Sequence, residues 1–297
     1  MKSEHPNGTS VRQIKHRLVL PIQTRGSLGK SLEAIMRGEW MRQYGIPWKG
    51  YDLDVYNHTL SDTYPDEVTL VQPSREPVAD IIKIMRKVNQ VAVTVIDPQA
   101  HMNKIILSAI AQVEFPKFAA EAQARATVLI FPLDEVSDME DISETVDTLG
   151  DTVDWVIVKN KERIPTTRFF DGSDLEKQLQ GYKAAYLDLP PLLTDTRNHL
   201  RGSQLKLGRT LSPAEAISNP SLEIDAVHRI LYQKWVADVY GIKPYNTEPR
   251  ETSGIKRIAV MHDDGVSAYG FEGMESELRE WMRSHGFPDN DWNLNIA

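Results

Sequence analysis

The stretch TRGSLGKSLEA, residues 24–34, decides how this chain folds. It follows the apolar run RLVLPI at 17–22, which predicts a buried strand, and leads into 31–45, where apolar side chains recur at helical spacing. A loop between a strand and a helix N-terminus points backbone N–H groups and the positive end of the helix dipole at whatever it encloses, which suits phosphate. The standard nucleotide-binding pattern G-x-x-x-x-G-K-[ST] needs glycine where this chain has Thr24, so the stretch is equally compatible with a glycine-containing turn.

The composition narrows the classes of protein and of chemistry. The chain has 297 residues, 41% of them hydrophobic, which allows one large α/β domain or two smaller ones. It has no cysteine, so disulfides, thiolate nucleophiles, iron–sulfur clusters and cysteine zinc sites are excluded. Its net charge of −8 disfavours a surface that is basic all over but allows a local basic patch. The polar N-terminus and the lack of an apolar run of roughly 18 to 20 residues predict a cytoplasmic protein without a membrane span.

Apolar, β-branched runs alternate along the chain with stretches of helical spacing. Predicted strands lie at 17–22, 47–54, 91–100, 126–135, 153–161 and 184–192, and predicted helices at 31–45, 78–90 and 137–151, the last with Ser137 as N-cap. This alternation is typical of parallel β-α-β units. We therefore expect an α/β fold with a mostly parallel sheet and helices on both faces.

Polar side chains interrupt the apolar runs where the predicted strands end. In a fold of this kind ligands bind beyond the carboxyl ends of the strands. Those ends carry the loop at 25–31, Asp52, Asp54, Asp97 and Asn160. We expect these residues to converge on one edge of the sheet.

The residue types at this edge suit phosphate and magnesium chemistry. Gly26 and Gly29 would let the backbone close around phosphate oxygens. Lys30 would reach the β- and γ-phosphates, and the Ser31 hydroxyl would bind Mg²⁺. Asp97 ends an apolar strand, where a carboxylate would orient the metal-bound water, although an aspartate before proline is also a common turn cap.

A second acidic pair ends the strand predicted at 47–54. Asp52 and Asp54 are two positions apart, so they would point to one side of that strand. One carboxylate could lie near the metal while the other holds the attacking water as acceptor or base, and a solvated loop pair is the alternative. His58 and His101 follow these acidic strand ends, but without a second histidine at ligand spacing we interpret them as ordinary loop residues.

Five short motifs occur in order along the chain: RGSLGKS, GYDLDVYNHTLS, VTVIDPQA, VDWVIVKNK and YLDLPPL. Together they resemble the ParA/MinD family of deviant-Walker ATPases over about 15–240, and DLDVYNHTLS is most similar to the plasmid-borne StbB- and TraL-like members. The resemblance implies a P-loop NTPase-type sheet that binds ATP and Mg²⁺, hydrolyses ATP to ADP and phosphate, and dimerises around the nucleotide.

The family pattern K-G-G-x-G-K-[ST] falls on Arg25, Gly26, Ser27, Leu28, Gly29, Lys30 and Ser31. The resemblance makes Lys30 the phosphate-binding lysine and Ser31 the magnesium ligand. It places Arg25 where the family has a signature lysine that reaches the partner's phosphates across an ATP-sandwich dimer. Arginine keeps the charge but has a planar fork instead of a point charge. This departure and Ser27 in place of the second glycine put the rate of hydrolysis in question more than nucleotide binding.

The remaining family roles fall on the other strand ends. The resemblance makes Asp54 the residue that activates water, Asp52 its neighbour near the metal and Asp97 the Walker B acid. It also implies that Asn160 reads the adenine edge and that Pro190 packs near the base.

The last third of the chain contains a basic segment and a long apolar stretch. Arg197, Arg201, Lys206 and Arg209 occur in 197–209 without an acidic residue. Since the family binds DNA without sequence preference through a basic face, this segment is the candidate for one, and a solvated loop is the alternative. The stretch 212–241 predicts a helix that is capped by Ser212 and packs on the sheet through Ile224, Val227, Ile230, Leu231 and Trp235.

The domain expectation is a ParA/MinD-like ATPase domain at 1–245 and an extension at 246–297 packed on it. In the extension, 246–254 is interpreted as a connector, IKRIAVMH at 255–262 as a strand and MESELREWMRSHG at 274–286 as a helix.

The function that the resemblance implies is an ATP-dependent dimerising switch. It would position, segregate or transfer plasmid DNA or a protein cargo, with slow hydrolysis stimulated by an unknown partner or adaptor protein. One alternative is a nucleotide-dependent metabolic ligase on the same fold. Another is a nucleotide-binding interaction module with little hydrolysis, which Arg25 and Ser27 keep open.

Overall fold

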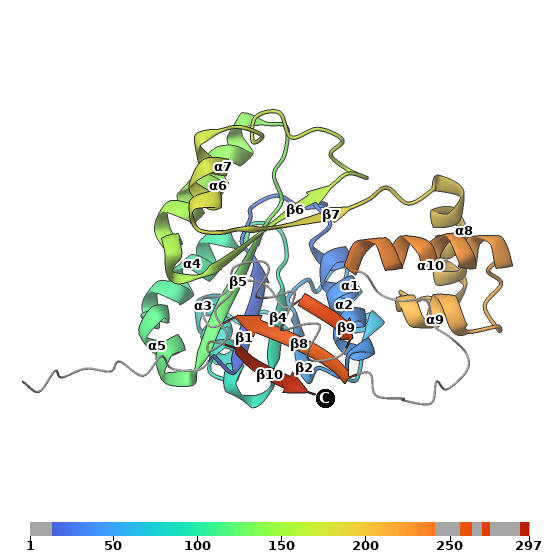
Figure 1. Ribbon diagram of the computed structural model, residues 1–297, viewed down its shortest axis with the longest axis horizontal. Coiled ribbons are helices and arrows are strands. Elements are labelled where there is room, and N and C mark those ends of the chain that lie inside the picture. Colours follow the sequence, from blue (N-terminus) through green and yellow to red (C-terminus); the bar gives the residue numbers. More distant parts are fainter. Residues whose placement is uncertain (1–13, 241–255, 263–268, 274–291, 297) are drawn as a thin grey trace, which may run out of the picture.

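The computed structural model describes residues 14–240 and, further along, the backbone of 256–262, 269–273 and 292–296. Seven strands form one sheet in the order β3-β2-β4-β1-β5-β6-β7, and every neighbouring pair is parallel (Figure 1). Their bounds are His16–Pro21 (β1), Trp48–Asp52 (β2), Val68–Leu70 (β3), Val93–Asp97 (β4), Ala124–Ile130 (β5), Asp154–Asn160 (β6) and Ala185–Leu189 (β7). The predicted α/β fold with a parallel sheet is confirmed.

Helices cover both faces of this sheet. They are Lys30–Gln43 (α1), Thr59–Thr63 (α2), Pro77–Met85 (α3), Asn103–Gln112 (α4), Phe115–Ala122 (α5), Val136–Leu149 (α6), Asp174–Gly181 (α7), Thr194–Leu207 (α8), Pro213–Ser218 (α9) and Ala226–Tyr240 (α10). In Figure 1, α3 to α7 lie on one side, and α1, α2 and α8 to α10 on the other.

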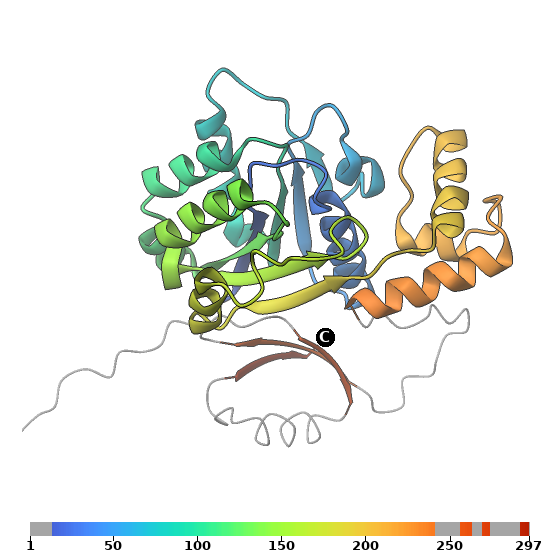
Figure 2. The ribbon, with the colours of Figure 1, turned by 90° about the horizontal axis from the view of Figure 1, so that it is seen from above.

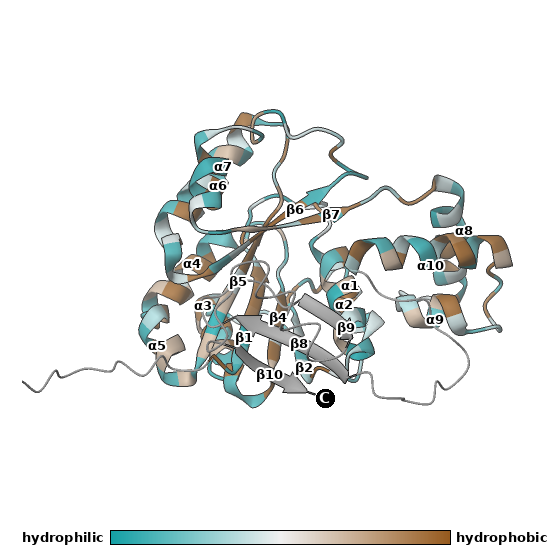
Figure 3. Cartoon of the chain, viewed as in Figure 1, coloured by the Kyte–Doolittle hydropathy of each residue, from teal (hydrophilic) through white to brown (hydrophobic). Residues whose placement is uncertain are grey.

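The central strand β1 contributes to two apolar cores. Leu18 and Leu20 belong to the core under α3 to α7, whereas Val19 belongs to the core under α1, α2 and α8 to α10. Successive strand side chains point to opposite faces, so a strand buried on both sides reads as a continuous apolar run. Figure 3 shows this as brown strands in the interior of the domain, with more teal on the outer helices.

Two predicted details of the helices are wrong. Ser137 does not cap α6, because the helix begins at Val136 and the extended residue before it is Glu135. The predicted helix at 212–241 is two helices, α9 and α10, although Ser212 does cap the first of them by accepting from the Glu215 N–H at 3.2 Å.

The predicted packing face of α10 is also wrong in part. Val227 and Ile230 are 59% and 53% exposed. The buried side chains of α10 are instead Tyr232, Trp235, Val236 and Val239. The reason is that α10 packs on α1, α8, α9 and the end of β7, so these neighbours and not the open face of the sheet select its buried side.

The described backbone beyond 240 forms a separate three-stranded antiparallel sheet in the order β10-β8-β9. Its strands are Lys256–His262 (β8), Tyr269–Gly273 (β9) and Trp292–Ile296 (β10), so the strand predicted at 255–262 is confirmed. The predicted connector at 246–254, the helix at 274–286 and the domain boundary at 245 lie outside the described residues. No helix in the described part of the chain is both long and apolar enough to cross a bilayer.

Candidate functional site

The predicted site residues lie at the carboxyl ends of the parallel strands. Asp52, Asp97 and Asn160 are the last residues of β2, β4 and β6, and the loop 22–29 leaves the end of β1. Asp52 pairs in register with Asp97 on the neighbouring strand. The predicted convergence of these strand ends on one edge of the sheet is therefore confirmed.

The loop between β1 and α1 is shaped by a glycine and by its support from β6. Gly29 directly precedes α1 with φ 101° and ψ 16°, a left-handed conformation that favours glycine. A Cβ at this position would lie 2.4 Å from Asn160 Nδ2, which donates a hydrogen bond to the Leu28 carbonyl at 2.8 Å. This loop, on the central strand of this sheet, gives the α/β arrangement of P-loop NTPases.

Ser27 also has a left-handed backbone, with φ 60°. This conformation costs a residue with a Cβ roughly 1–2 kcal/mol, which explains why the pattern that the loop resembles has glycine here. We expect Ser27→Gly to raise the free energy of unfolding by up to about 1 kcal/mol, since the greater freedom of glycine in the unfolded chain offsets part of the gain. Thermal melts should place the variants in the order Ser27→Gly above wild type, with Ser27→Ala at or below it. The reverse order would show that the loop does not hold this conformation in solution.

Lys30 bends back over the loop. Lys30 is a buried residue at the start of α1, and its Nζ donates to the Arg25 carbonyl at 3.3 Å. Burial lowers the pKa of Lys30, while the negative charges of Asp97, Asp54 and Asp141 oppose that shift. The amine of Lys30 lies at the loop, where it could bind an anionic ligand such as a phosphate.

Arg25 is engaged by acidic residues of its own chain. Nη1 donates to Glu135 at 2.5 Å and to Asp138 at 2.8 Å, both at the start of α6. These hydrogen bonds raise the pKa of Arg25 above its usual range, and the bond to Glu135 has the largest effect. The guanidinium must leave both partners before it can reach a phosphate of another subunit.

Asp141 is a site residue that the sequence reasoning missed. Its carboxylate accepts from the Thr24 N–H at 2.9 Å, from the Thr24 hydroxyl at 2.7 Å and from Asn103 Nδ2 at 2.7 Å. It thereby ties the start of the β1–α1 loop to the first turn of α4. In the sequence it is one of many acidic residues of a solvated-looking helix, so no local signal distinguishes it.

Asp97 is the most unusual group at this edge. It is 1% exposed, and neither of its carboxylate oxygens has a hydrogen-bond partner in the described structure. Desolvation raises the pKa of Asp97 to about 7, although the neighbouring Ser31 hydroxyl and the charge of Lys30 favour the ionised form. A buried carboxylate whose oxygens accept no hydrogen bond within the described chain, next to a hydroxyl, offers the hard oxygen ligands that Mg²⁺ prefers.

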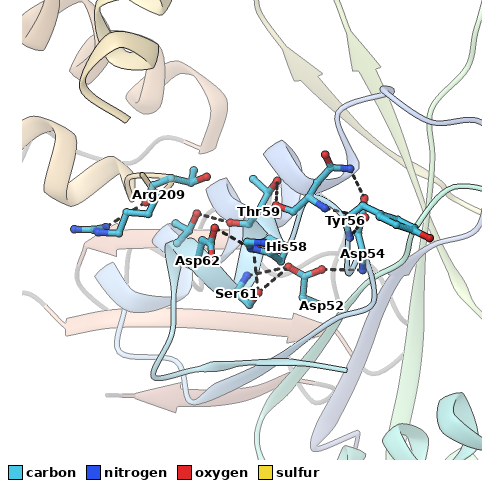
Figure 4. A network of polar contacts seen from close by, with 11 residues as sticks. Asp52, Asp54, Tyr56, His58, Thr59, Ser61, Asp62 and Arg209 are labelled. Atoms are coloured by element: carbon cyan, nitrogen blue, oxygen red, sulfur yellow. Dashed lines mark hydrogen bonds and ion pairs between the residues drawn. The ribbon is translucent and has the colours of Figure 1, made fainter. Parts of the chain in front are cut away.

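Asp52 and Asp54 organise the loop that follows β2 (Figure 4). The fully buried Asp52 accepts from the backbone N–H groups of Asp54 and Ser61, both at 3.0 Å, and from the Ser61 hydroxyl at 3.2 Å. Asp54 accepts from the Tyr56 and Asn57 N–H groups, both at 3.1 Å. Asp52 therefore fixes the loop from which Asp54 is presented, and the metal role of Asp52 stays a prediction.

Asn160 and Pro190, the two residues expected near the adenine base, both make hydrogen bonds within the protein. Asn160 keeps its Oδ1 buried and unpartnered among the described residues, while Nδ2 supports the β1–α1 loop. Pro190 follows β7, and its carbonyl accepts from Trp235 Nε1 of α10 at 2.7 Å. Asn160 thus has one acceptor available, and both base contacts stay predictions.

No protein-family model matches the chain, and no curated protein matches it. Among solved structures, MinD cell division protein of Aquifex aeolicus aligns with 80% of this chain and 100% of its own, at 12% identity and a TM-score of 0.40. The signal recognition particle receptor FtsY of Elizabethkingia anophelis aligns with 59% of this chain and 58% of its own, at 10% identity and a TM-score of 0.41. A nucleotide-binding protein of Archaeoglobus fulgidus in complex with ADP aligns with 80% of this chain and 93% of its own, at 13% identity and a TM-score of 0.38. At these values the likeness decides nothing about activity, and the fold assignment rests on the strand order and loop described above.

Proposed function

We propose that this protein is a switch of the ParA/MinD type that depends on ATP and Mg²⁺. The observation that carries the proposal is Asp97, a buried carboxylate that accepts no hydrogen bond from the described residues and lies beside Ser31 and Lys30, at the strand edge where such folds bind ligands. A buried carboxylate without hydrogen bonds destabilises the protein when it is charged, and Lys30 offsets that cost only in part, because the pKa of Asp97 is still raised. A further cation would offset more of it. A metal-bound nucleotide supplies that cation together with phosphates for Lys30.

Each residue of the site has a role in this proposal. The backbone of 25–31 and Lys30 would hold the phosphates, and Ser31 with Asp97 would hold Mg²⁺, which supplies positive charge at the phosphate oxygens. Asp54 would accept a hydrogen bond from the attacking water and orient it. The hydrogen bonds that Asp54 receives from Tyr56 and Asn57 keep its carboxylate in place for that task.

The switch itself would be a homodimer that forms around ATP, with Arg25 reaching the partner's phosphates. We expect Arg25→Ala to weaken ATP-dependent dimerisation about tenfold or more while each chain still binds ATP, because the chain's own phosphate contacts are unchanged. Glu135→Gln combined with Asp138→Asn should strengthen dimerisation, since it releases Arg25 from its ion pairs. Sedimentation with ATP checks both. If Arg25→Ala dimerises like the wild type, Arg25 has no role across the interface.

The experiment that tests the proposal is the measurement of molecular mass by light scattering with ADP, ATP and a slowly hydrolysed analogue. Wild type should be monomeric with ADP and dimeric with the analogue. Asp54→Ala should stay dimeric with ATP itself, because hydrolysis no longer resets it. An unchanged mass for both proteins with every nucleotide would rule out the switch.

The cargo is the least constrained part of the proposal. The segment 197–209 is helical as far as Leu207, where α8 ends, so it is not a loop, although most of it is exposed. Three of its cations form ion pairs, Arg197 with Glu162, Lys206 with Glu223 and Arg209 with Glu215, which reduces the positive potential available to DNA. Loss of low-salt DNA binding in Arg201→Glu with Lys206→Glu would support a DNA face, and no binding by the wild type would remove it.

A nucleotide-binding module with little hydrolysis is the second candidate, and the ion pairs of Arg25 favour it. This candidate predicts that the protein binds nucleotide but hydrolyses little of it, whether or not the protein dimerises. The switch proposal includes three further parts: a role in handling plasmid DNA, a partner protein that stimulates hydrolysis, and a cytoplasmic location.

A further inference from the structure

A group of three metal-binding side chains lies away from the β1–α1 loop, between α8 and α10. Asp195 and His199 are four residues apart on α8 and so share one face of that helix. His228 lies on α10, which packs against α8 (Figure 2). One potential ligand atom from each of these side chains lies within 4.8 Å of the other two.

His228 is already oriented as a metal ligand requires. Its Nδ1 is 3.1 Å from the hydroxyl of Thr196, a fully buried residue, and its Nε2 is 3.6 Å from Asp195 Oδ2. When Nδ1–H donates to that hydroxyl, Nε2 carries the free lone pair and faces Asp195. Histidine ligands of metals are usually fixed in this way through the second ring nitrogen.

The two imidazoles are held face to face. The rings of His199 and His228 stack with centroids 3.9 Å apart and 29° between their planes. His199 and Asp195 are exposed, so both can rotate toward a shared ion, while His228, whose side chain is 13% exposed, stays fixed. A bound ion therefore needs only movement of the two exposed side chains.

We propose that Asp195, His199 and His228 form a zinc site that joins α8 to α10. Two imidazole nitrogens and one carboxylate are typical Zn²⁺ ligands, and water would complete four-coordination. Mg²⁺ prefers oxygen ligands alone, so this site and the Ser31–Asp97 pair would select different ions.

Helix α10, one of the two helices that the zinc site would join, also contacts segments next to the proposed nucleotide site. From α10, Trp235 donates to the Pro190 carbonyl at 2.7 Å, and the Tyr240 hydroxyl donates to Glu33 in the first turn of α1. Zinc held between α8 and α10 would stabilise α10 in the position from which it makes these contacts.

The test is a zinc titration by calorimetry on tag-free, chelator-treated protein without nucleotide. We expect one Zn²⁺ per chain. His199→Ala and His228→Ala should each weaken binding about 100-fold or more, and Thr196→Val about tenfold, because it removes the partner of the His228 ring. With Co²⁺ in place of zinc, the wild type should show the strong visible absorption of a tetrahedral site, and His199→Ala should lose it.

His58 provides a matched control, because it also pairs with an aspartate four residues away, Asp62, at 2.9 Å, but is not part of a three-residue ligand group among the described residues. His58→Ala should bind zinc like the wild type. No zinc binding by the wild type, or wild-type binding retained in the exposed-residue variant His199→Ala, would overturn the proposal. Because the titration contains no nucleotide, its failure would leave the switch proposal untouched.

Discussion

Asp97→Asn should raise the melting temperature of the nucleotide-free protein by several degrees at pH 8 in EDTA. The wild-type carboxylate is buried and accepts no hydrogen bond from the part of the chain that the structure describes, and its pKa is raised from an ordinary 3.8 to about 7. Above pH 7 it is charged in the folded state at a cost of several kcal/mol, since each pKa unit corresponds to about 1.4 kcal/mol. An uncharged amide avoids most of this cost, although its own buried polar groups still cost about 1–3 kcal/mol.

The pH dependence of the effect has a definite sign. As the pH rises from about 4 to about 7, the unfolded chain loses this proton while folded Asp97 keeps it, so the wild type loses stability over that range. The gain from Asp97→Asn should therefore grow between about pH 4 and 7 and stay constant above. Denaturant unfolding at a series of pH values measures this difference directly.

A control and an opposing result complete this prediction. The exposed Asp66 can be replaced by asparagine without a comparable effect on stability. With ATP and Mg²⁺ present, Asp97→Asn should lack the metal-dependent stabilisation that the wild type gains. An Asp97→Asn protein that melts no higher than the wild type at pH 8 would show that the charged carboxylate does not destabilise the folded protein in solution.

Gly29→Ala should weaken nucleotide binding at least tenfold and lower the free energy of unfolding by about 2 kcal/mol. The new methyl group would lie 2.4 Å from Asn160 Nδ2, and the left-handed backbone at φ 101° adds strain. Asn160 cannot move away freely, because it is buried and bound to the Leu28 carbonyl. Calorimetric titration with ATP and thermal melts measure the two effects.

Gly45 separates the two causes. It also has a positive φ, 64°, but a Cβ there would meet no atom of the described residues within 4 Å. Gly45→Ala should therefore lose about 1 kcal/mol of stability and keep its ATP affinity. If Gly29→Ala binds ATP as tightly as Gly45→Ala does, the loop is not the nucleotide site.

The sequence was sufficient to predict that Asp97 and Asn160 lie at strand ends, but not where every strand ends, since the strand predicted at 126–135 ends at Ile130. Asp97 closes a β-branched run and Asn160 closes another, and both patterns depend only on local alternation of burial. Helix α1 was equally visible, because its apolar residues recur along one strongly periodic stretch and Gly45 marks its end. The parallel sheet followed from the alternation of these elements.

The contacts of the site could not be predicted in the same way. Arg25 meets Glu135, and Thr24 meets Asp141, across more than a hundred residues of sequence, and no local pattern records such pairs. The buried face of α10 was misassigned for a related reason. Helix α10 packs on α1, α8, α9 and β7, and in this packing Trp235 is buried while Ile230 is exposed, although both are apolar.

The central claim, that the β1–α1 loop binds ATP with Mg²⁺, is tested most directly by calorimetric titration of ATP into the wild type and Lys30→Ala, each with Mg²⁺ and with EDTA. We predict one ATP per wild-type chain with Mg²⁺ and binding at least tenfold weaker in EDTA. In Lys30→Ala, loss of a charged hydrogen bond worth about 1.5–3 kcal/mol should weaken binding about 10- to 100-fold. The claim would be contradicted if the wild type did not bind ATP, or if neither EDTA nor Lys30→Ala changed the affinity for ATP.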